Sequence, residues 1–186
     1  PYAMPRRYDG GLDVQRLLHT IGTQGTDYEF YQWRFNLHTG QTREGVVDDI
    51  LNTEFPMINA RYQGLRTRYT YHVLMGRMRT LEQPHFAGLV KYDLERGTAV
   101  AQHPGDGFWF SEAPFAERDG AQAEDDGYLV GFVWNEREQR SEVWVHDAQA
   151  LQDGPLARVV LPQRVPNGFH ATWVPQAQLD RHRVSA

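Results

Sequence analysis

The side chains most able to do chemistry in this chain are its eight histidines, which are scattered along the sequence. No two of them stand at the close spacing of a local pair of metal ligands. His38 and His146 lie at the edges of expected turns and His182 lies in a polar tail, so we interpret all three as surface histidines. The chain has no cysteine, which excludes disulfides, zinc ribbons, iron–sulfur ligation and thiol nucleophiles.

His170 differs from the other histidines in its surroundings. It stands in "RVPNGFHATWVP" (164–175), between a Pro-Asn-Gly bend and a short, largely apolar run. A bend relaxed by glycine can aim the imidazole into the protein. Two interpretations stay open on these residues alone. One is a metal ligand whose partners lie elsewhere, and the other is a hydrogen-bonded core histidine, which is the commoner case.

Four acidic residues could suggest the carboxylate pair of a glycan-processing hydrolase. They are Glu112, Glu124, Asp125 and Asp126. Carboxylates in glycine-rich loops usually form turns or face solvent, so the turn interpretation is favoured. The sequence contains no P-loop, no GxSxG, no HExxH and no dinucleotide fingerprint.

The composition is that of a folded globular protein, with 186 residues, 40% hydrophobic and 12% aromatic. A net charge of −5 does not support nucleic-acid binding. No stretch approaches the roughly 20 apolar residues of a membrane span. The start "PYAMPRRYDGG" has no signal-peptide core, and its opening Pro1 predicts that the natural start lies upstream. We expect a cytoplasmic location, with which the lack of cysteine is compatible.

Three segments share one layout of an apolar run, a short polar turn and a second run. They cover residues 31–47, 88–100 and 141–161. Apolar and polar residues alternate in these runs, which is typical of β-strands, and Asn or Asp followed by Gly is typical of hairpin turns. The expected turns are Thr39-Gly40, Arg96-Gly97 and residues 135–139.

The spacing of these hairpins predicts their assembly. Asn36, Asp93 and Asp147 occupy equivalent places before the turns and lie 57 and 54 positions apart. A β-unit that recurs at about 50 residues is typical of a propeller blade, although three such units cannot close a ring. An irregular β-sandwich remains equally open on the repeat alone. Only residues 10–22 have helical character, and the tail after Pro175 is polar.

Three longer stretches resemble consecutive C-terminal signatures of the carotenoid cleavage oxygenases. They are "TEFPMINARYQGLRTRYTY" (53–71), "FSEAPFAERDGAQAEDDGYLVGFVW" (110–134) and "LPQRVPNGFHATWVP" (161–175). Their order and approximate spacing also match that family, and the resemblance extends from about residue 26 onward. It favours the propeller over the sandwich. It implies an all-β fold in which residues 1–186 form about three C-terminal blades of one seven-bladed β-propeller, without a second domain.

The resemblance also implies a metal site and roles for two residues. The family holds one Fe(II) on four histidines, and the last of these is the histidine of the GFH motif, here His170. Its three partners would then lie upstream of Pro1. The glutamate of the EFP motif, here Glu54, accepts a hydrogen bond from the Nδ1–H of a ligand histidine, and we expect that histidine to be His170. We interpret Glu112 and the Asp125-Asp126-Gly127 turn as structural, with Glu112 paired to an arginine or to loop amides.

The activity implied by the resemblance is cleavage of an alkene C=C by O2 into two carbonyl products. The expected partners are an apolar polyene or stilbene, O2 and the missing N-terminal part of the propeller, with peripheral membrane contact in the full protein. With one ligand of four, the chain alone should be inactive. The alternative is a non-catalytic propeller lobe that serves as a binding or scaffold module, in which His170 binds nothing.

Overall fold

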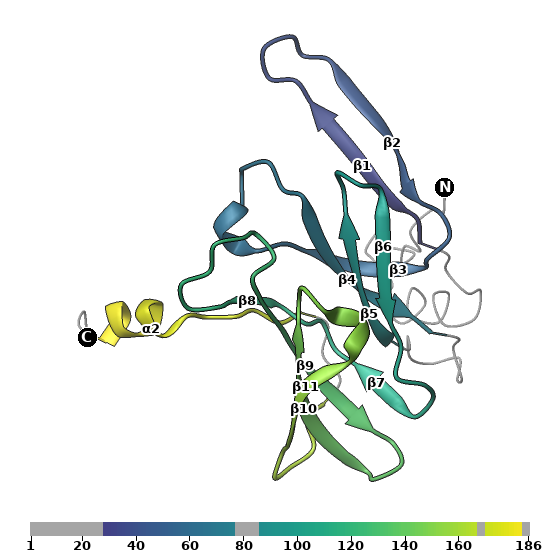
Figure 1. The fold of residues 1–186 in the computed structure, drawn as a ribbon, viewed down its shortest axis with the longest axis vertical. Coiled ribbons are helices and arrows are strands. Elements are labelled where there is room, and N and C mark those ends of the chain that lie inside the picture. Colours follow the sequence, from purple (N-terminus) through teal and green to yellow (C-terminus); the bar gives the residue numbers. More distant parts are fainter. Residues whose placement is uncertain (1–27, 77–85, 167–169, 184–186) are drawn as a thin grey trace, which may run out of the picture. The chain divides into compact units, whose positions relative to one another are not determined.

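The computed structural model describes residues 28–76, 86–166 and 170–183, and strands dominate all three ranges (Figure 1). The chain divides into two compact units. One comprises residues 1–52 and 75–85, and the other comprises residues 53–74 and 86–186. The segment 10–22, for which the sequence predicts helical character, lies outside the described residues.

The first unit contains a single described hairpin of two antiparallel strands, β1 (Phe30–Phe35) and β2 (Thr42–Asp48). Its turn lies where the sequence predicts it. Gly40 has a φ of 71°, a left-handed conformation that glycine adopts without steric cost. The Asn36 side chain accepts the backbone N–H groups of His38 and Thr39 at 2.9 and 3.1 Å. This side-chain turn fixes the register of the two strands.

The second unit begins with a four-stranded sheet in the order β3-β4-β5-β6. Its strands are β3 (Thr53–Met57), β4 (Tyr69–Met75), β5 (Phe86–Asp93) and β6 (Thr98–Gln102). A short 3-10 turn, η1 (Ala60–Tyr62), lies between β3 and β4. The β5–β6 hairpin turns at Gly97, with a φ of 63°, as predicted. Asp93 caps this turn, and the hydrogen bond from Arg68 lowers the pKa of its carboxyl to about 2.

The remaining strands form a second sheet in the order β11-β10-β9-β7, with β8 also paired to β9. They are β7 (Phe108–Phe110), β8 (Phe115–Glu117), β9 (Gly127–Asn135), β10 (Arg140–Asp147) and β11 (Pro155–Val160). A 3-10 turn, η2 (Leu151–Asp153), precedes β11. The third predicted hairpin turn is also confirmed, because residues 136–139 join β9 to β10.

The C-terminal tail is more regular than its polar sequence suggests. Residues Gln176–Arg183 form the helix α2, which starts directly after Pro175. No described helix is long and apolar enough to cross a membrane. The described residues therefore confirm a mainly β structure, built from antiparallel hairpins that follow one another along the chain.

Alternate side chains of β9 and β10 form the core of the second sheet. Leu129 and Val133 are buried on β9, and Glu142, Trp144 and His146 are buried on β10. The interpretation of His146 as a surface histidine is therefore wrong. β10 continues regularly up to Asp147, so the alternation that buries Trp144 also buries the residue two positions later.

The two sheets of the second unit are joined by the acidic loop, residues 124–126. Both carboxylate oxygens of Glu124 accept the Arg68 N–H, at 2.9 and 3.1 Å, and one also accepts the Tyr69 N–H at the start of β4. Asp125 forms an ion pair of 2.5 Å with Lys91 of β5. These residues precede β9, so the loop connects one sheet to the other. The structural interpretation of the Asp-Asp-Gly turn is confirmed.

We predict that removing one partner of the Lys91–Asp125 pair destabilises the second unit. Both side chains are 12% exposed, so Lys91→Met leaves a largely buried carboxylate without its cation. The expected loss is about 3 kcal/mol in the free energy of unfolding, measured by denaturant titration. The double variant Lys91→Met/Asp125→Asn should recover part of it. A loss of about 1 kcal/mol or less, as for an exposed pair, would contradict this role.

We also predict a pH-dependent contribution of His146 to stability. Burial, with a smaller effect of Arg158, lowers the pKa of this imidazole from 6.5 to about 4. The unfolded chain therefore takes up a proton near pH 6.5 that the folded chain does not, and stability falls as the pH drops from 6.5 toward 4. The full difference between the unfolded and folded pKa values of His146 corresponds to about 3 kcal/mol of unfolding free energy. In His146→Leu, unfolding free energies at pH 7.5 and 5 should differ less than in the native protein, and equal differences would refute the prediction.

Candidate functional site

His170 is held beside a buried carboxylate. Its side chain is 78% exposed, and its Nδ1 lies 3.6 Å from Oε2 of Glu112. The same Oε2 accepts the backbone N–H of Ala171 at 2.6 Å. One carboxylate therefore fixes the main chain directly after the histidine and also faces one of its ring nitrogens. The distance of 3.6 Å is longer than a hydrogen bond, but it places the negative charge on the Nδ1 side of the ring.

The position of Glu112 follows from the short strands that surround it. Glu112 comes two residues after β7 and lies three residues before β8, both of which pair with β9. The neighbouring Ser111 is fixed to β9 by two hydrogen bonds, because its N–H donates to the Phe132 carbonyl and its Oγ accepts the Phe132 N–H. This anchored backbone delivers the Glu112 carboxylate to the segment that carries His170.

The sequence interpretation of Glu112 is therefore only partly correct. Its carboxylate accepts a loop amide, as the sequence predicts, but it also faces His170, for which the sequence predicts Glu54 as the partner. The sequence signal that could point to Glu112 is its place just after an aromatic β-run in the second motif. Its 58-residue separation from His170 gave no reason to pair the two.

Glu54 lies in β3 and is partly buried. Its Oε2 accepts the N–H of the following residue, Phe55, at 3.1 Å. Within the described part of the chain, its carboxylate makes no ion pair with the His170 ring, so the expected pairing of these two residues is wrong. The physical reason is a bulge at Glu54–Met57, which turns the carboxylate toward its own backbone and brings the Phe55 ring to His170 instead. Support of another histidine by Glu54 stays a prediction.

Phe55 completes the immediate surroundings of His170. The two rings meet edge to face, with centroids 5.3 Å apart and planes at 72°. Phe55 makes a similar contact with Phe86 of β5, at 5.4 Å. The site thus brings together three distant stretches of sequence, around residues 55, 112 and 170.

This arrangement fits one ligand of a metal centre. Metal-binding histidines usually direct one ring nitrogen to a carboxylate or carbonyl, which orients the ring and leaves the other nitrogen for the metal. His170 has Glu112 on its Nδ1 side, so Nε2 is the nitrogen suited to a metal. Among the described residues, no group of three or more His, Cys, Asp or Glu could hold an ion. A metal at His170 would therefore need ligands from outside these residues.

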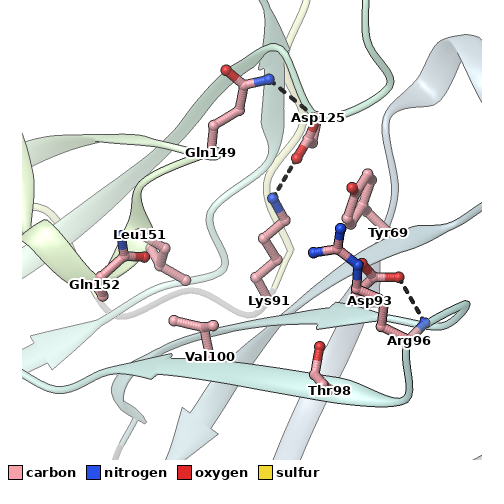
Figure 2. A pocket seen from close by; sticks show the side chains of 10 residues that line it. All are labelled: Tyr69, Lys91, Asp93, Arg96, Thr98, Val100, Asp125, Gln149, Leu151 and Gln152. Atoms are coloured by element: carbon pink, nitrogen blue, oxygen red, sulfur yellow. Dashed lines mark hydrogen bonds and ion pairs between the residues drawn. The ribbon is translucent and has the colours of Figure 1, made fainter.

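A second feature is a small pocket of about 230 Å³ between the two sheets of the second unit (Figure 2). Lys91 extends through it to Asp125, and Gln149 reaches the same carboxylate at 3.2 Å. The Lys91 ammonium also donates to the Ala148 carbonyl at 2.8 Å and lies 4.3 Å from the centre of the Tyr69 ring. These polar groups satisfy one another, so the pocket serves the joint between the sheets.

Comparisons with known proteins relate this chain to one family. The family model of the retinal pigment epithelial membrane protein matches residues 7–175. Carotenoid 9,10(9',10')-cleavage dioxygenase 1 of Arabidopsis thaliana is 34% identical over 169 residues, which are 84% of this chain and 30% of that protein. A carotenoid cleavage oxygenase of Mycobacterium tuberculosis is 35% identical over 150 residues, 77% of this chain and 28% of that protein.

Solved structures show the same fold. The lignostilbene dioxygenase of Pseudomonas brassicacearum superposes with a TM-score of 0.70 at 29% identity, covering 78% of this chain and 32% of the other. A Synechocystis apocarotenoid oxygenase gives 0.68 at 23% identity, covering 78% and 30%. The chain thus spans about a third of the length of its relatives and is part of a β-propeller. It belongs to the retinal pigment epithelial membrane protein family, the family of the carotenoid cleavage oxygenases.

Proposed function

We propose that this chain is the C-terminal part of an oxygenase that splits an alkene C=C with O2. Both oxygen atoms end in the two carbonyl products, so the reaction needs no external reductant. The substrate class is an apolar polyene of the carotenoid or apocarotenoid type, or a stilbene, in keeping with the names of the relatives. The observation that carries the proposal is the His170–Glu112 arrangement in a chain of this family.

The proposed resident metal is Fe(II), which supplies the activation of O2 when it is bound. His170 would hold it through Nε2, and further histidines from the rest of the protein would complete the site. The choice of an imidazole suits iron, and a neutral ligand leaves the positive charge of the metal uncompensated.

Glu112 performs two tasks in this proposal. Its hydrogen bond from Ala171 anchors the backbone of the ligand segment, and its charge favours the tautomer of His170 that carries the proton on Nδ1. That tautomer presents the lone pair of Nε2 to the metal. A buried carboxylate strengthens this preference, because the low local dielectric weakens the interaction less than water does.

The remaining partners follow from the proposed reaction. The rest of the propeller is needed for the other ligands and for an apolar passage that excludes water from the reacting bond. Peripheral contact of the full protein with a membrane would give access to an apolar substrate.

We predict that His170→Ala in the full-length protein abolishes cleavage and lowers bound iron. The segment that carries His170 is anchored through the Ala171 N–H, so the fold should persist without the imidazole. The measurements are iron stoichiometry, turnover of an apocarotenoid and a stilbene, and a thermal unfolding curve. Normal iron with normal turnover in His170→Ala would mean that His170 is not a metal ligand, whereas a native full-length protein with neither iron nor turnover would be the non-catalytic propeller lobe.

Replacement of Glu112 should act on the metal through His170. We expect Glu112→Gln to weaken iron binding or turnover by about 10–100-fold, as is usual when the carboxylate partner of a ligand histidine is lost. The amide retains an acceptor for the Ala171 N–H, so the backbone anchor should remain. Glu54→Gln, measured in parallel, tests whether the Glu54 carboxylate supports another ligand histidine. If it does, iron binding or turnover should fall by about the same factor. If Glu112→Gln matches the native protein in iron affinity and turnover, the assignment of Glu112 is wrong.

A further inference from the structure

Phe55 has a backbone conformation that its sequence position does not favour. Its φ is 54°. Among the described residues other than glycine, Gln139 alone shares a positive φ with it. Gln139 lies in the turn between β9 and β10, where such a conformation is ordinary. Phe55 lies within β3 and directly precedes a proline. A bulky residue in the left-handed region is a genuine outlier, and such strain persists only where the surrounding structure enforces it.

The bulge that contains Phe55 has a definite geometric result. In a regular strand, Glu54 and Phe55 would point to opposite faces of the sheet. Here the register shifts between Glu54 and Met57, and the Phe55 N–H donates to the Glu54 carboxylate. The Phe55 ring contacts both Phe86 and His170, edge to face in each case.

Within the described ranges, the His170 ring contacts the Glu112 carboxylate and the Phe55 ring. The side chain is 78% exposed, and Glu112 approaches only its Nδ1. A single charge near Nδ1 still allows the imidazole plane to rotate around that nitrogen. An edge-to-face contact with another ring, by contrast, constrains the tilt of the imidazole plane. The Glu112 charge beside Nδ1 and the edge-to-face contact with Phe55 together limit the directions in which Nε2 can point.

We propose that Phe55 is a positioning residue for His170, and that the strained bulge of β3 exists to hold its ring against the imidazole. This inference rests on the proposed function, since a fixed direction of Nε2 matters only if that nitrogen binds the metal. Phe55 acts through His170 and takes no part in the chemistry itself.

The experiment compares iron binding in Phe55→Leu and Phe55→Tyr of the full-length protein. Leucine keeps apolar bulk but removes the ring edge, whereas tyrosine retains the ring. We expect about 3- to 10-fold weaker iron affinity in Phe55→Leu, the range expected when one aromatic contact is lost. The electron paramagnetic resonance spectrum of the ferrous nitrosyl adduct should broaden or shift, because it reports the ligand arrangement. Phe55→Tyr should restore the native affinity and spectrum.

Phe108→Leu is the matched control, because Phe108 is a buried aromatic residue that contacts Trp144, with centroids 5.1 Å apart. It should lower the unfolding midpoint without changing the nitrosyl spectrum. Two results would overturn the inference. One is a native spectrum and iron affinity in Phe55→Leu with only a higher KM, which would make Phe55 a substrate contact. The other is lower stability alone, which would make it a core residue. The proposed function would stand in both cases, since its own test is the loss of iron in His170→Ala.

Discussion

The acidic loop at residues 124–126 is the constraint on which the second unit depends. Its three consecutive carboxylates serve three different elements. Glu124 accepts two backbone N–H groups at the start of β4, Asp125 pairs with Lys91 of β5, and Asp126 pairs with Arg118 after β8. Each sheet alone leaves one face and its edges uncovered. Because the acidic loop is bonded to both sheets, it holds them together.

The Gly127 that follows this loop shows how closely the elements approach. A Cβ atom at this position would lie 2.5 Å from the Ala116 carbonyl oxygen and 2.5 Å from the Phe115 ring. Only glycine fits, because real Cβ atoms do not make such contacts with backbone. The close approach lets β8 pair with the start of β9, and β8 in turn lies close along the chain to Glu112. The joint between the sheets and the site at His170 are thus parts of one arrangement.

Burial divides the polar residues of this unit into two kinds. Glu142 is buried, yet it accepts hydrogen bonds from Asn135, Arg140 and Trp144, so its charge is compensated. His72 is likewise buried and lies between the hydroxyls of Thr53 and Thr70. His170 is the contrast, since its ring is largely exposed while its carboxylate neighbour is buried. His170 therefore has a ring nitrogen open to solvent beside a buried carboxylate, whereas Glu142 and His72 are hydrogen-bonded within the core.

The sequence by itself determined the local structure and one residue of the site. Strand alternation and turn residues predicted the hairpin turns at Thr39-Gly40, Arg96-Gly97 and residues 135–139, because hairpin geometry depends on a few neighbouring residues. The motif around His170 identified that histidine by resemblance. Only the tertiary structure decided which carboxylate faces it. Glu54 and Glu112 both stood in matching motifs, but the bulge at Phe55 turned one carboxylate toward its own backbone and the pairing of β7 and β8 with β9 delivered the other. The burial of His146 was decided in the same way, by how far β10 continues beside β9, which no local pattern contains.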